Sequence, residues 1–280
     1  MLAPFVDLLA ERRRAGAGLG AFTCYDLETA VGVLAAAAER GAGVVLLVGS
    51  ASFAAPDGSE LLAGLRAVAE RSPARACVQL DHVSELGLIE AAFALGAGAV
   101  MADGSQLALE ENAALVAAAV SLARASGGAV EAELGHVSGD EDVATAAAVG
   151  RLTDPEVVDG FVARTGAACL AVSIGNAHGT YAHPPALDWP RLDAIRAATA
   201  VALSLHGASG LGVGMLRRAI AAGVTKVNVN TELREAYLAA TAAALPGAQD
   251  GHRVLDLHRE QAAAVRAVAA SKLAQYEPEG

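Results

Sequence analysis

The stretch ACVQLDHV, residues 76–83, begins as a largely apolar segment and ends with an acid beside a base. Apolar residues at successive positions, as in 76–80, are typical of a strand that is buried on both faces of a parallel sheet. Asp81 and His82 follow directly. Neighbours on a regular strand point to opposite faces, so we expect the strand to stop or bend at Leu80 for both side chains to reach one site.

The same kind of short apolar segment recurs along the whole chain. Together with 76–80, the candidate strands are residues 18–24, 43–49, 97–102, 129–134, 168–174, 200–205 and 225–230. Between them lie segments with helical periodicity: 26–40, 58–71, 84–95, 106–125, 154–165, 190–199, 211–222 and 231–244. No Pro- or Ser-rich linker interrupts this order, which favours a single domain over residues 1–280.

Eight β/α units predict an α/β fold, a single (β/α)8 TIM barrel, for which about 250 residues is typical. Residues 1–14 and 254–274 are expected to add N- and C-terminal helices. Asp26, Ser84 and the Asp154-Pro155 pair are candidate helix starts. The alternative is an open doubly wound sheet, but no GxGxxG motif follows the first strand to support dinucleotide binding.

Composition narrows the function classes. A formal net charge of −11 with a pI near 5.1 argues against a nucleic-acid binder, because that function needs clustered Lys and Arg. The three cysteines lie far apart and are interpreted as buried thiols in a reducing compartment. No signal peptide is recognised, and no segment approaches the ~20 uninterrupted apolar residues of a membrane span. We therefore expect a cytoplasmic protein with no membrane partner.

Unusual polar residues share one position, the C-terminal end of a predicted strand. They are Asp81, His82, Asp103, Glu133, His178, His206, Asn228 and Asn230. In a TIM barrel these ends form one rim, where active sites are built. Three histidines that meet there predict a zinc site with an open position. The other four histidines are interpreted as structural, with a reservation about His136.

Two loops at the same rim have the features of a phosphate site. Residues 206–210 (HGASG) and 228–232 (NVNTE) each lead into a predicted helix. Helix N-termini bind phosphate, and barrels commonly place that site after strands seven and eight. Glycine is also common in such loops as a turn former, but Ser209 and Thr231 add hydroxyl donors.

Six motifs together resemble those of the class II, zinc-dependent ketose-bisphosphate aldolases, of the fructose- and tagatose-bisphosphate type. They are QLDHV (79–83), VMADGS (100–105), EAELGHVSGDED (131–142), AVSIGNAHGTY (171–181), LSLHGASG (203–210) and KVNVNTEL (226–233). The short interval between the third and fourth motifs is more similar to the tagatose type. The resemblance covers about residues 18–238, in the family's order.

The resemblance implies a role for each matching residue. Catalytic Zn²⁺ ligands would be His82, His178 and His206, and Glu133 with Asp103 would form a nearby alternative metal position. Asp81 would be the acid/base, and Glu141 would move the α-proton of the substrate. The phosphate and hydroxyls of dihydroxyacetone phosphate would contact Gly179, Gly207, Ala208, Ser209, Asn228, Val229, Asn230 and Thr231. A monovalent cation, Na⁺ or K⁺, is expected beside them, and a homodimer or homotetramer is expected.

Departures from the family pattern concern the half of the site that faces the aldehyde. Thr23 replaces an asparagine, Val83 and Ser138 replace glycines, and Leu47 with Gly49 or Ser50 replaces a Gln and a Ser. The family's DPR segment, which supplies an arginine for a second phosphate, is not recognisable, although Arg253 or Arg259 could substitute. We therefore expect an aldolase whose acceptor aldehyde differs from glyceraldehyde 3-phosphate.

Two alternatives from other classes remain. A zinc-dependent hydrolase on the same barrel would usually carry HxH on its first strand, where this chain has AFTCYD. A non-catalytic sugar-phosphate sensor predicts loss of the acid/base residues, yet Asp81 and Glu141 are both present.

Overall fold

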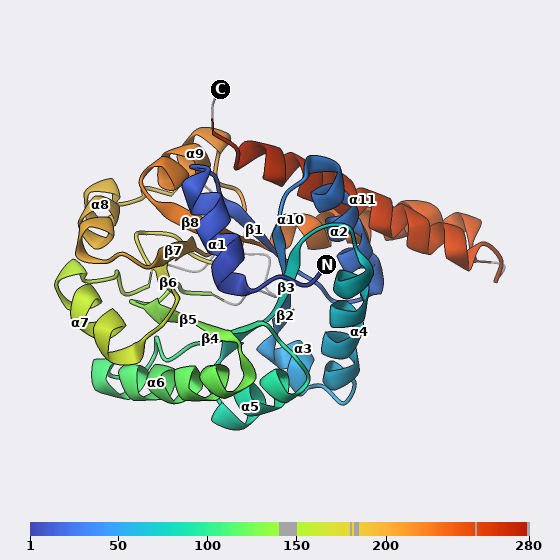
Figure 1. Ribbon diagram of the computed structural model, residues 1–280. Coiled ribbons are helices and arrows are strands. Elements are labelled where there is room, and N and C mark those ends of the chain that lie inside the picture. Colours follow the sequence, from blue (N-terminus) through green and yellow to red (C-terminus); the bar gives the residue numbers. More distant parts are fainter. Residues whose placement is uncertain (140–149, 180, 182–184, 250, 279–280) are drawn as a thin grey trace.

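The fold is a closed barrel of eight parallel strands surrounded by helices, seen in a computed structural model that describes residues 1–139, 150–179, 181, 185–249 and 251–278 (Figure 1). The strands pair in sequence order, and β8 closes on β1. They are β1 (Leu19–Thr23), β2 (Val44–Gly49), β3 (Ala76–Val83), β4 (Ala99–Ala102), β5 (Ala129–Leu134), β6 (Cys169–Val172), β7 (Ala202–Leu205) and β8 (Val224–Val229). The predicted TIM barrel is confirmed.

The helices follow the strands as the apolar periodicity predicted. They are α1 (Phe5–Arg14), α2 (Leu27–Arg40), α3 (Ser50–Ala54), α4 (Gly58–Arg71), α5 (Leu86–Ala94), α6 (Leu109–Ser126), α7 (Pro155–Thr165), α8 (Trp189–Ala198), α9 (Val213–Ala221), α10 (Thr231–Ala244), η1 (Leu245–Gly247) and α11 (Val254–Gln275). The expected N- and C-terminal helices are α1 and α11. The short α3 and η1 were not predicted.

Two of the three predicted helix starts are confirmed. Asp26 caps α2 by accepting from the Thr29 N–H, and Asp154 caps α7 with Pro155 in the first turn. Ser84 is wrong as a start, because α5 begins at Leu86 after Glu85, which makes no side-chain capping bond.

The barrel interior is divided along its axis into an apolar half and a polar half. At the N-terminal end, Phe5, Leu8 and Leu9 of α1 close the barrel against small and branched side chains of the strands. These strand residues are Leu19, Ala21, Val45, Leu47, Cys77, Ala99, Cys169 and Ala202. One step further along β3 and β5, the inward positions hold Gln79 and Glu131 instead, both fully buried. Period-two alternation therefore carries polar side chains towards the C-terminal rim.

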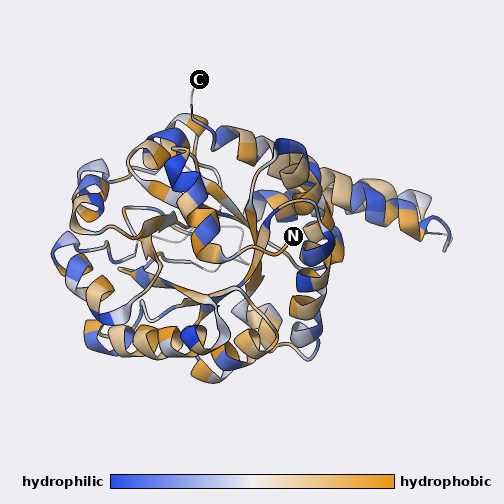
Figure 2. Cartoon of the chain, in the orientation of Figure 1, coloured by the Kyte–Doolittle hydropathy of each residue, from blue (hydrophilic) through white to orange (hydrophobic). Residues whose placement is uncertain are grey.

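A second core lies between the strands and the surrounding helices, which turn their hydrophilic faces outward (Figure 2). α11 crosses α2 and α10, and its N-terminal part extends beyond the barrel (Figure 1). Gly32 allows α2 and α11 to approach closely, since a Cβ there would lie 2.5 Å from the Ala262 carbonyl oxygen. All three cysteines are buried, as predicted. Over the described residues, no helix is both long and apolar enough for a membrane span.

Candidate active site

The end of β3 places Asp81 and His82 on the same cavity through a local irregularity. The strand does not stop at Leu80, which was one of the two expectations; it continues to Val83. Its register with β4 shifts between Leu80 and Val83, and His82 has a left-handed backbone with φ of 48°. Such a conformation costs about 1–3 kcal/mol for a non-glycine residue and occurs at functional sites. Both side chains line one cavity as a result.

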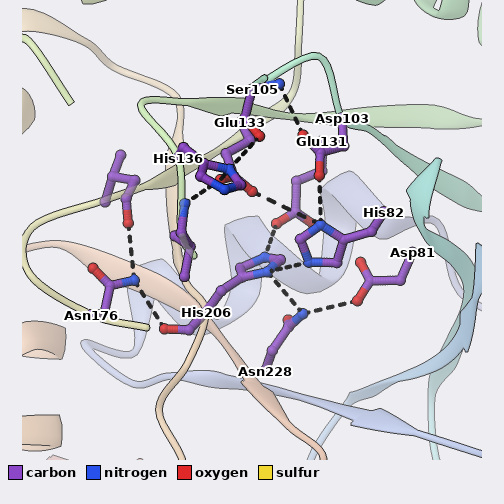
Figure 3. Close-up of polar contacts among 12 residues, drawn as sticks. Asp81, His82, Asp103, Ser105, Glu131, Glu133, His136, Asn176, His206 and Asn228 are labelled. Atoms are coloured by element: carbon purple, nitrogen blue, oxygen red, sulfur yellow. Dashed lines mark hydrogen bonds and ion pairs between the residues drawn. The ribbon is translucent and has the colours of Figure 1, made fainter. Parts of the chain in front are cut away.

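Three histidines from three strands converge at the rim. His82 lies on β3, His178 follows β6, and His206 follows β7, and one ligand atom of each lies within 4.8 Å of the others. The His82 Nε2 and His206 Nδ1 atoms face each other at 2.9 Å (Figure 3). Imidazole nitrogens that converge in this way fit a zinc ion that keeps a position open for substrate.

A second possible metal position shares His82. The ligand atoms of His82, Asp103 and Glu133 also lie within 4.8 Å of one another. His82 Nδ1 lies 2.8 Å from Asp103 Oδ2 and 3.9 Å from Glu133 Oε2. The other carboxylate oxygens are held by the backbone, because Ser105 N–H donates to Asp103 and Val137 N–H donates to Glu133.

The two carboxyls of this second position have pKa values that are shifted in opposite directions. Burial, reinforced by the negative charge of Asp103, raises the pKa of Glu133 to about 8. Burial alone would also raise the pKa of Asp103, but hydrogen bonds from His82 and Ser105 hold it well below its usual range. A divalent cation would lower the pKa of Glu133 and favour the doubly ionised pair.

His206 is oriented by a buried ion pair inside the barrel. Its Nε2 lies 3.0 Å from Glu131 Oε1 (Figure 3). Glu131 Oε2 in turn lies 2.8 Å from Lys226 Nζ and accepts a hydrogen bond from Gln79. Burial lowers the pKa of His206 to about 4. A neutral imidazole that donates Nε2–H to a carboxylate leaves its Nδ1 lone pair facing the site, as a metal ligand requires.

The same lysine also reaches the proposed acid/base. Lys226 Nζ donates to Asn228 Oδ1 at 2.6 Å, and Asn228 Nδ2 donates to Asp81 Oδ2 at 3.0 Å. Lys226 therefore contacts both Glu131, which orients His206, and Asn228, which is hydrogen-bonded to Asp81. Its charge is fully buried and is balanced by Glu131.

Asp81 and three of the predicted metal ligands, His82, Asp103 and His178, line a cavity of about 290 Å³, termed the metal cavity. Its walls come from the ends of several strands and the loops after them. The lining residues are Thr23, Tyr25, Gly49, Ser50, Ala51, Ser52, Asp81, His82, Asp103, Gln106, His136, Val137, Gly139, His178 and Asn230. No lysine or arginine is among these lining residues, within the part of the chain that the structure describes.

The loops after β6 and β7 are joined at the rim. Tyr181 donates to the Gly207 carbonyl and accepts from the Ala177 N–H, each at 2.8 Å. Gly207 has φ of 59°, and a Cβ there would lie 2.2 Å from the Ala177 carbonyl oxygen. Gly179 is also buried in this region. Only glycine fits the Gly207 position, so the backbone conformation and the close approach of Ala177 account for the residue type there. The contact of Gly207 with the donor stays a prediction.

In the loop after β7, which was expected to bind phosphate, two donor groups are hydrogen-bonded to a carboxylate of α10. The Ser209 hydroxyl and the Gly210 N–H both donate to Glu232, which forms an ion pair with Lys272 of α11 at 2.6 Å.

The remaining predicted donor contacts differ in what their side chains face. Ala208 is buried within the loop after β7, and Thr231 is buried at the start of α10. Asn230 accepts a hydrogen bond from Tyr25. The Val229 side chain packs in the outer core, so only its backbone is left to contact a ligand. The predicted catalytic Glu141 lies outside the described residues.

Comparisons with known proteins identify the family. The family described as fructose-bisphosphate aldolase class-II matches residues 4–280. A D-tagatose-1,6-bisphosphate aldolase subunit, GatY of Klebsiella oxytoca, is 39% identical over 232 residues, which cover 82% of each chain. The chain belongs to the class II fructose-bisphosphate aldolase family. It is a class II aldolase, a carbon–carbon lyase.

Solved structures support the same fold. The YdjI aldolase from Escherichia coli K12 is 30% identical and superposes with a TM-score of 0.86, covering 100% of this chain and 99% of that one. The fructose-bisphosphate aldolase of Campylobacter jejuni shares the fold at 17% identity, with a TM-score of 0.82 over 98% of this chain and 95% of that one.

Sequence reasoning missed several residues of this class II aldolase site. Glu131 lies two residues before Glu133, and Lys226 lies two residues before Asn228, so alternation on a strand places each pair on one face. That spacing is the signal in the sequence that could have found them. The reservation about His136 was justified, because it lines the metal cavity and its Nδ1 lies 3.0 Å from Ser105 Oγ.

The positions that depart from the family pattern are not all in the cavity of this aldolase. Thr23, Gly49 and Ser50 line it, whereas Leu47 packs in the apolar half of the barrel. Neither arginine considered for a second phosphate lines the metal cavity: Arg253 lies beside Gly247, and Arg259 pairs with Asp256 on α11.

Proposed function

We propose that this class II aldolase is zinc-dependent and makes or cleaves a ketose phosphate through an enediolate of dihydroxyacetone phosphate. The observation that carries the proposal is that the ligand atoms of three imidazoles lie within 4.8 Å of one another, beside a cavity that is lined by Asp81 and by two of the three, His82 and His178. His82, His178 and His206 would hold the zinc, and His82, Asp103 and Glu133 would form an alternative position. When bound, the ion acts as a Lewis acid that stabilises negative charge developing on the donor oxygens.

The chain's own residues bind the donor and move protons. The backbone N–H groups of Gly179 and Ser209, and the N–H and hydroxyl of Thr231 at the N-terminus of α10, offer donors for the phosphate. Removal of a proton beside the ketone, assigned by family resemblance to Glu141, gives the enediolate. In synthesis Asp81 donates a proton to the aldehyde oxygen, and in cleavage it takes that proton back from the C4 hydroxyl.

Further features of the proposal rest on the family alone. They are a monovalent cation, Na⁺ or K⁺, beside the phosphate, and a homodimer or homotetramer. The cytoplasmic location is proposed instead from the dispersed, buried cysteines, which are typical of a reducing compartment. The substrates are small sugar phosphates, in agreement with the names of the relatives.

Asp81→Ala tests the proposal against the two alternatives. We expect the variant to keep its zinc and lose turnover by at least about a hundredfold, the lower end of general acid–base effects. The matched control is Asp159→Ala, an exposed position on α7, which should keep both. A sensor would keep its ligand response in Asp81→Ala. A hydrolase would release phosphate or another hydrolysis product, with no carbon–carbon bond made or broken.

Metal dependence is tested separately. Protein purified without chelator should contain zinc, and EDTA should abolish activity until zinc is restored. Unchanged activity after EDTA, or a zinc content below about a tenth of an equivalent, contradicts the zinc assignment. Efficient cleavage of fructose or tagatose bisphosphate contradicts the expectation of a different acceptor aldehyde.

A further inference from the structure

A second cavity of about 230 Å³ adjoins the metal cavity. It lies between the start of α2 and the first turns of α10, and we call it the annex. Its lining residues are Thr23, Tyr25, Asp26, Thr29, Leu233, Arg234, Tyr237 and Leu238. Thr23 and Tyr25 line both cavities. A substrate that reacts beside Asp81 can therefore extend into the annex without crossing the body of the protein.

The annex has a mainly apolar wall and no excess of positive charge. Leu233, Leu238 and the rings of two tyrosines supply its apolar surface. Asp26 accepts from the Thr29 N–H and hydroxyl at 2.8 and 2.7 Å and is hydrogen-bonded to Tyr237. One carboxylate and one guanidinium, that of Arg234, line the annex, so their charges balance. Such a wall favours an uncharged group over a phosphate.

A polar atom stands at the junction of the two cavities. The Thr23 hydroxyl is buried, with 4% of the residue exposed, and it has no hydrogen-bond partner among the described residues. A buried hydroxyl without a partner costs about 1–3 kcal/mol, which a hydrogen bond from a ligand offsets. Thr23 therefore marks where a substrate hydroxyl would lie, at the entrance to an apolar space.

We propose that the annex binds the uncharged, apolar end of the acceptor aldehyde, and that Thr23 hydrogen-bonds the hydroxyl next to its carbonyl. The acceptor is thus a short 2-hydroxyaldehyde with an alkyl end. This inference rests on the proposed aldolase function. In synthesis the enediolate carbon bonds to the aldehyde carbon, the carbonyl electron pair moves to oxygen, and that oxygen takes a proton from Asp81. No oxidant or further reactant is needed.

A substrate panel with the zinc-loaded enzyme and dihydroxyacetone phosphate tests the proposal. The probes are lactaldehyde, 2-hydroxybutanal and 2-hydroxypentanal, compared with glyceraldehyde 3-phosphate. We expect kcat/KM to rise about fourfold for each added CH₂ until the annex is filled. We also expect glyceraldehyde 3-phosphate to be the poorest of the four. A preference for the phosphorylated aldehyde overturns the proposal.

Exchange of the α-proton of dihydroxyacetone phosphate tests the proposed aldolase function independently of the annex. Dihydroxyacetone phosphate incubated in D₂O should incorporate deuterium with no aldehyde present, because that half-reaction does not involve the annex. No exchange contradicts the proposed aldolase function. Exchange without the expected order of aldehydes contradicts only the assignment of the annex.

Leu238→Lys tests whether the aldehyde end lies in the annex, because Leu238 lines that cavity. Leu238 is 58% exposed, so the variant is expected to fold. We expect kcat/KM for 2-hydroxypentanal to fall about tenfold and that for glyceraldehyde 3-phosphate to rise. The matched control is Leu255→Lys on α11, which is 71% exposed and does not line the annex. It should change neither value.

Two further outcomes complete the test. If Leu238→Lys dissociates an oligomer and leaves aldehyde preference unchanged, the annex is a subunit contact and the proposal is wrong. Thr23→Val should remove the preference for lactaldehyde over propanal, and Thr23→Ser should restore it. An unchanged preference in Thr23→Val contradicts the role of the hydroxyl.

Discussion

The Nε2 atom of His206 lies 3.0 Å from Oε1 of Glu131, and both side chains are fully buried. This contact presents Nδ1 of His206 to the site, so Glu131 acts as a positioning residue for a proposed zinc ligand.

Glu131→Gln should weaken zinc binding about 10- to 100-fold, because an amide can present its NH₂ to the ring and favour the wrong tautomer. Competition with a chromophoric chelator measures the affinity directly. Glu110→Gln, in an exposed ion pair with Arg164, is the matched control and should bind zinc like the parent. Equal zinc affinities in the two variants would mean that Glu131 does not influence His206 as a zinc ligand.

Lys226→Met should destabilise the metal-free protein by about 3–5 kcal/mol, because it leaves the Glu131 carboxylate buried without its cation. The free energy of unfolding in urea is the measurement. The double variant Glu131→Gln/Lys226→Met should recover part of the loss, since neither side chain is then charged. Arg164→Met breaks an exposed pair and should cost less than about 1 kcal/mol. A Lys226→Met variant as stable as that control would contradict a structural ion pair.

The cysteine thiols should be unreactive in the folded protein. Burial raises the pKa of Cys77 to about 12, and burial also raises the pKa values of Cys24 and Cys169. A disulfide reagent at pH 8 should label none of them until the protein is unfolded, when three react. Ser126→Cys, at an exposed position, should react at once and serves as the control.

The same shift predicts the direction of a pH effect on stability. An unfolded Cys77 thiol ionises near its ordinary pKa of 9.0, whereas the folded one keeps its proton up to about pH 12. Between these values the unfolded state binds fewer protons, so the free energy of unfolding falls as pH rises. A urea midpoint that increased from pH 9 to pH 11 would contradict this assignment.

Apolar periodicity was sufficient to predict the barrel, because each strand is buried on both faces and each helix has one apolar face. The location of the site followed from strand ends, which meet at one rim in this fold. For the chain at Asp81 and His82, the sequence allowed two geometries: a strand that stops at Leu80 or one that bends there. A strand can end or bend to bring neighbours together, and nothing in QLDHV distinguishes a left-handed residue from a chain end.

Contacts between elements that are distant along the chain could not be predicted from the sequence. The Lys226 and Glu131 pair depends on β5 and β8 facing each other across the barrel, and residue spacing does not encode that distance. The annex depends on how α2 and α10 lie beside each other. Leu238 looks like an ordinary exposed leucine in the sequence, and only the packed structure places it near Thr23.

Gly207→Ala should damage both the donor site and the fold. The residue has φ of 59°, and its Cβ would lie 2.2 Å from the Ala177 carbonyl oxygen, so the loops after β6 and β7 must separate. We expect a loss of about 1–3 kcal/mol in the free energy of unfolding from the strained backbone. We also expect KM for dihydroxyacetone phosphate to rise at least tenfold, since the backbone N–H groups of this loop are displaced.

Gly212→Ala provides the control within the same segment of the chain. Gly212 precedes α9 with φ of −64°, and a Cβ there would meet no atom of another described residue within 4 Å beyond its chain neighbours. This variant should keep its donor KM and lose less than about 1 kcal/mol. If the two alanine variants had the same KM and the same unfolding midpoint, the close contact between Gly207 and Ala177 would not hold the donor loop, because both substitutions add the same methyl group and differ only in what surrounds it.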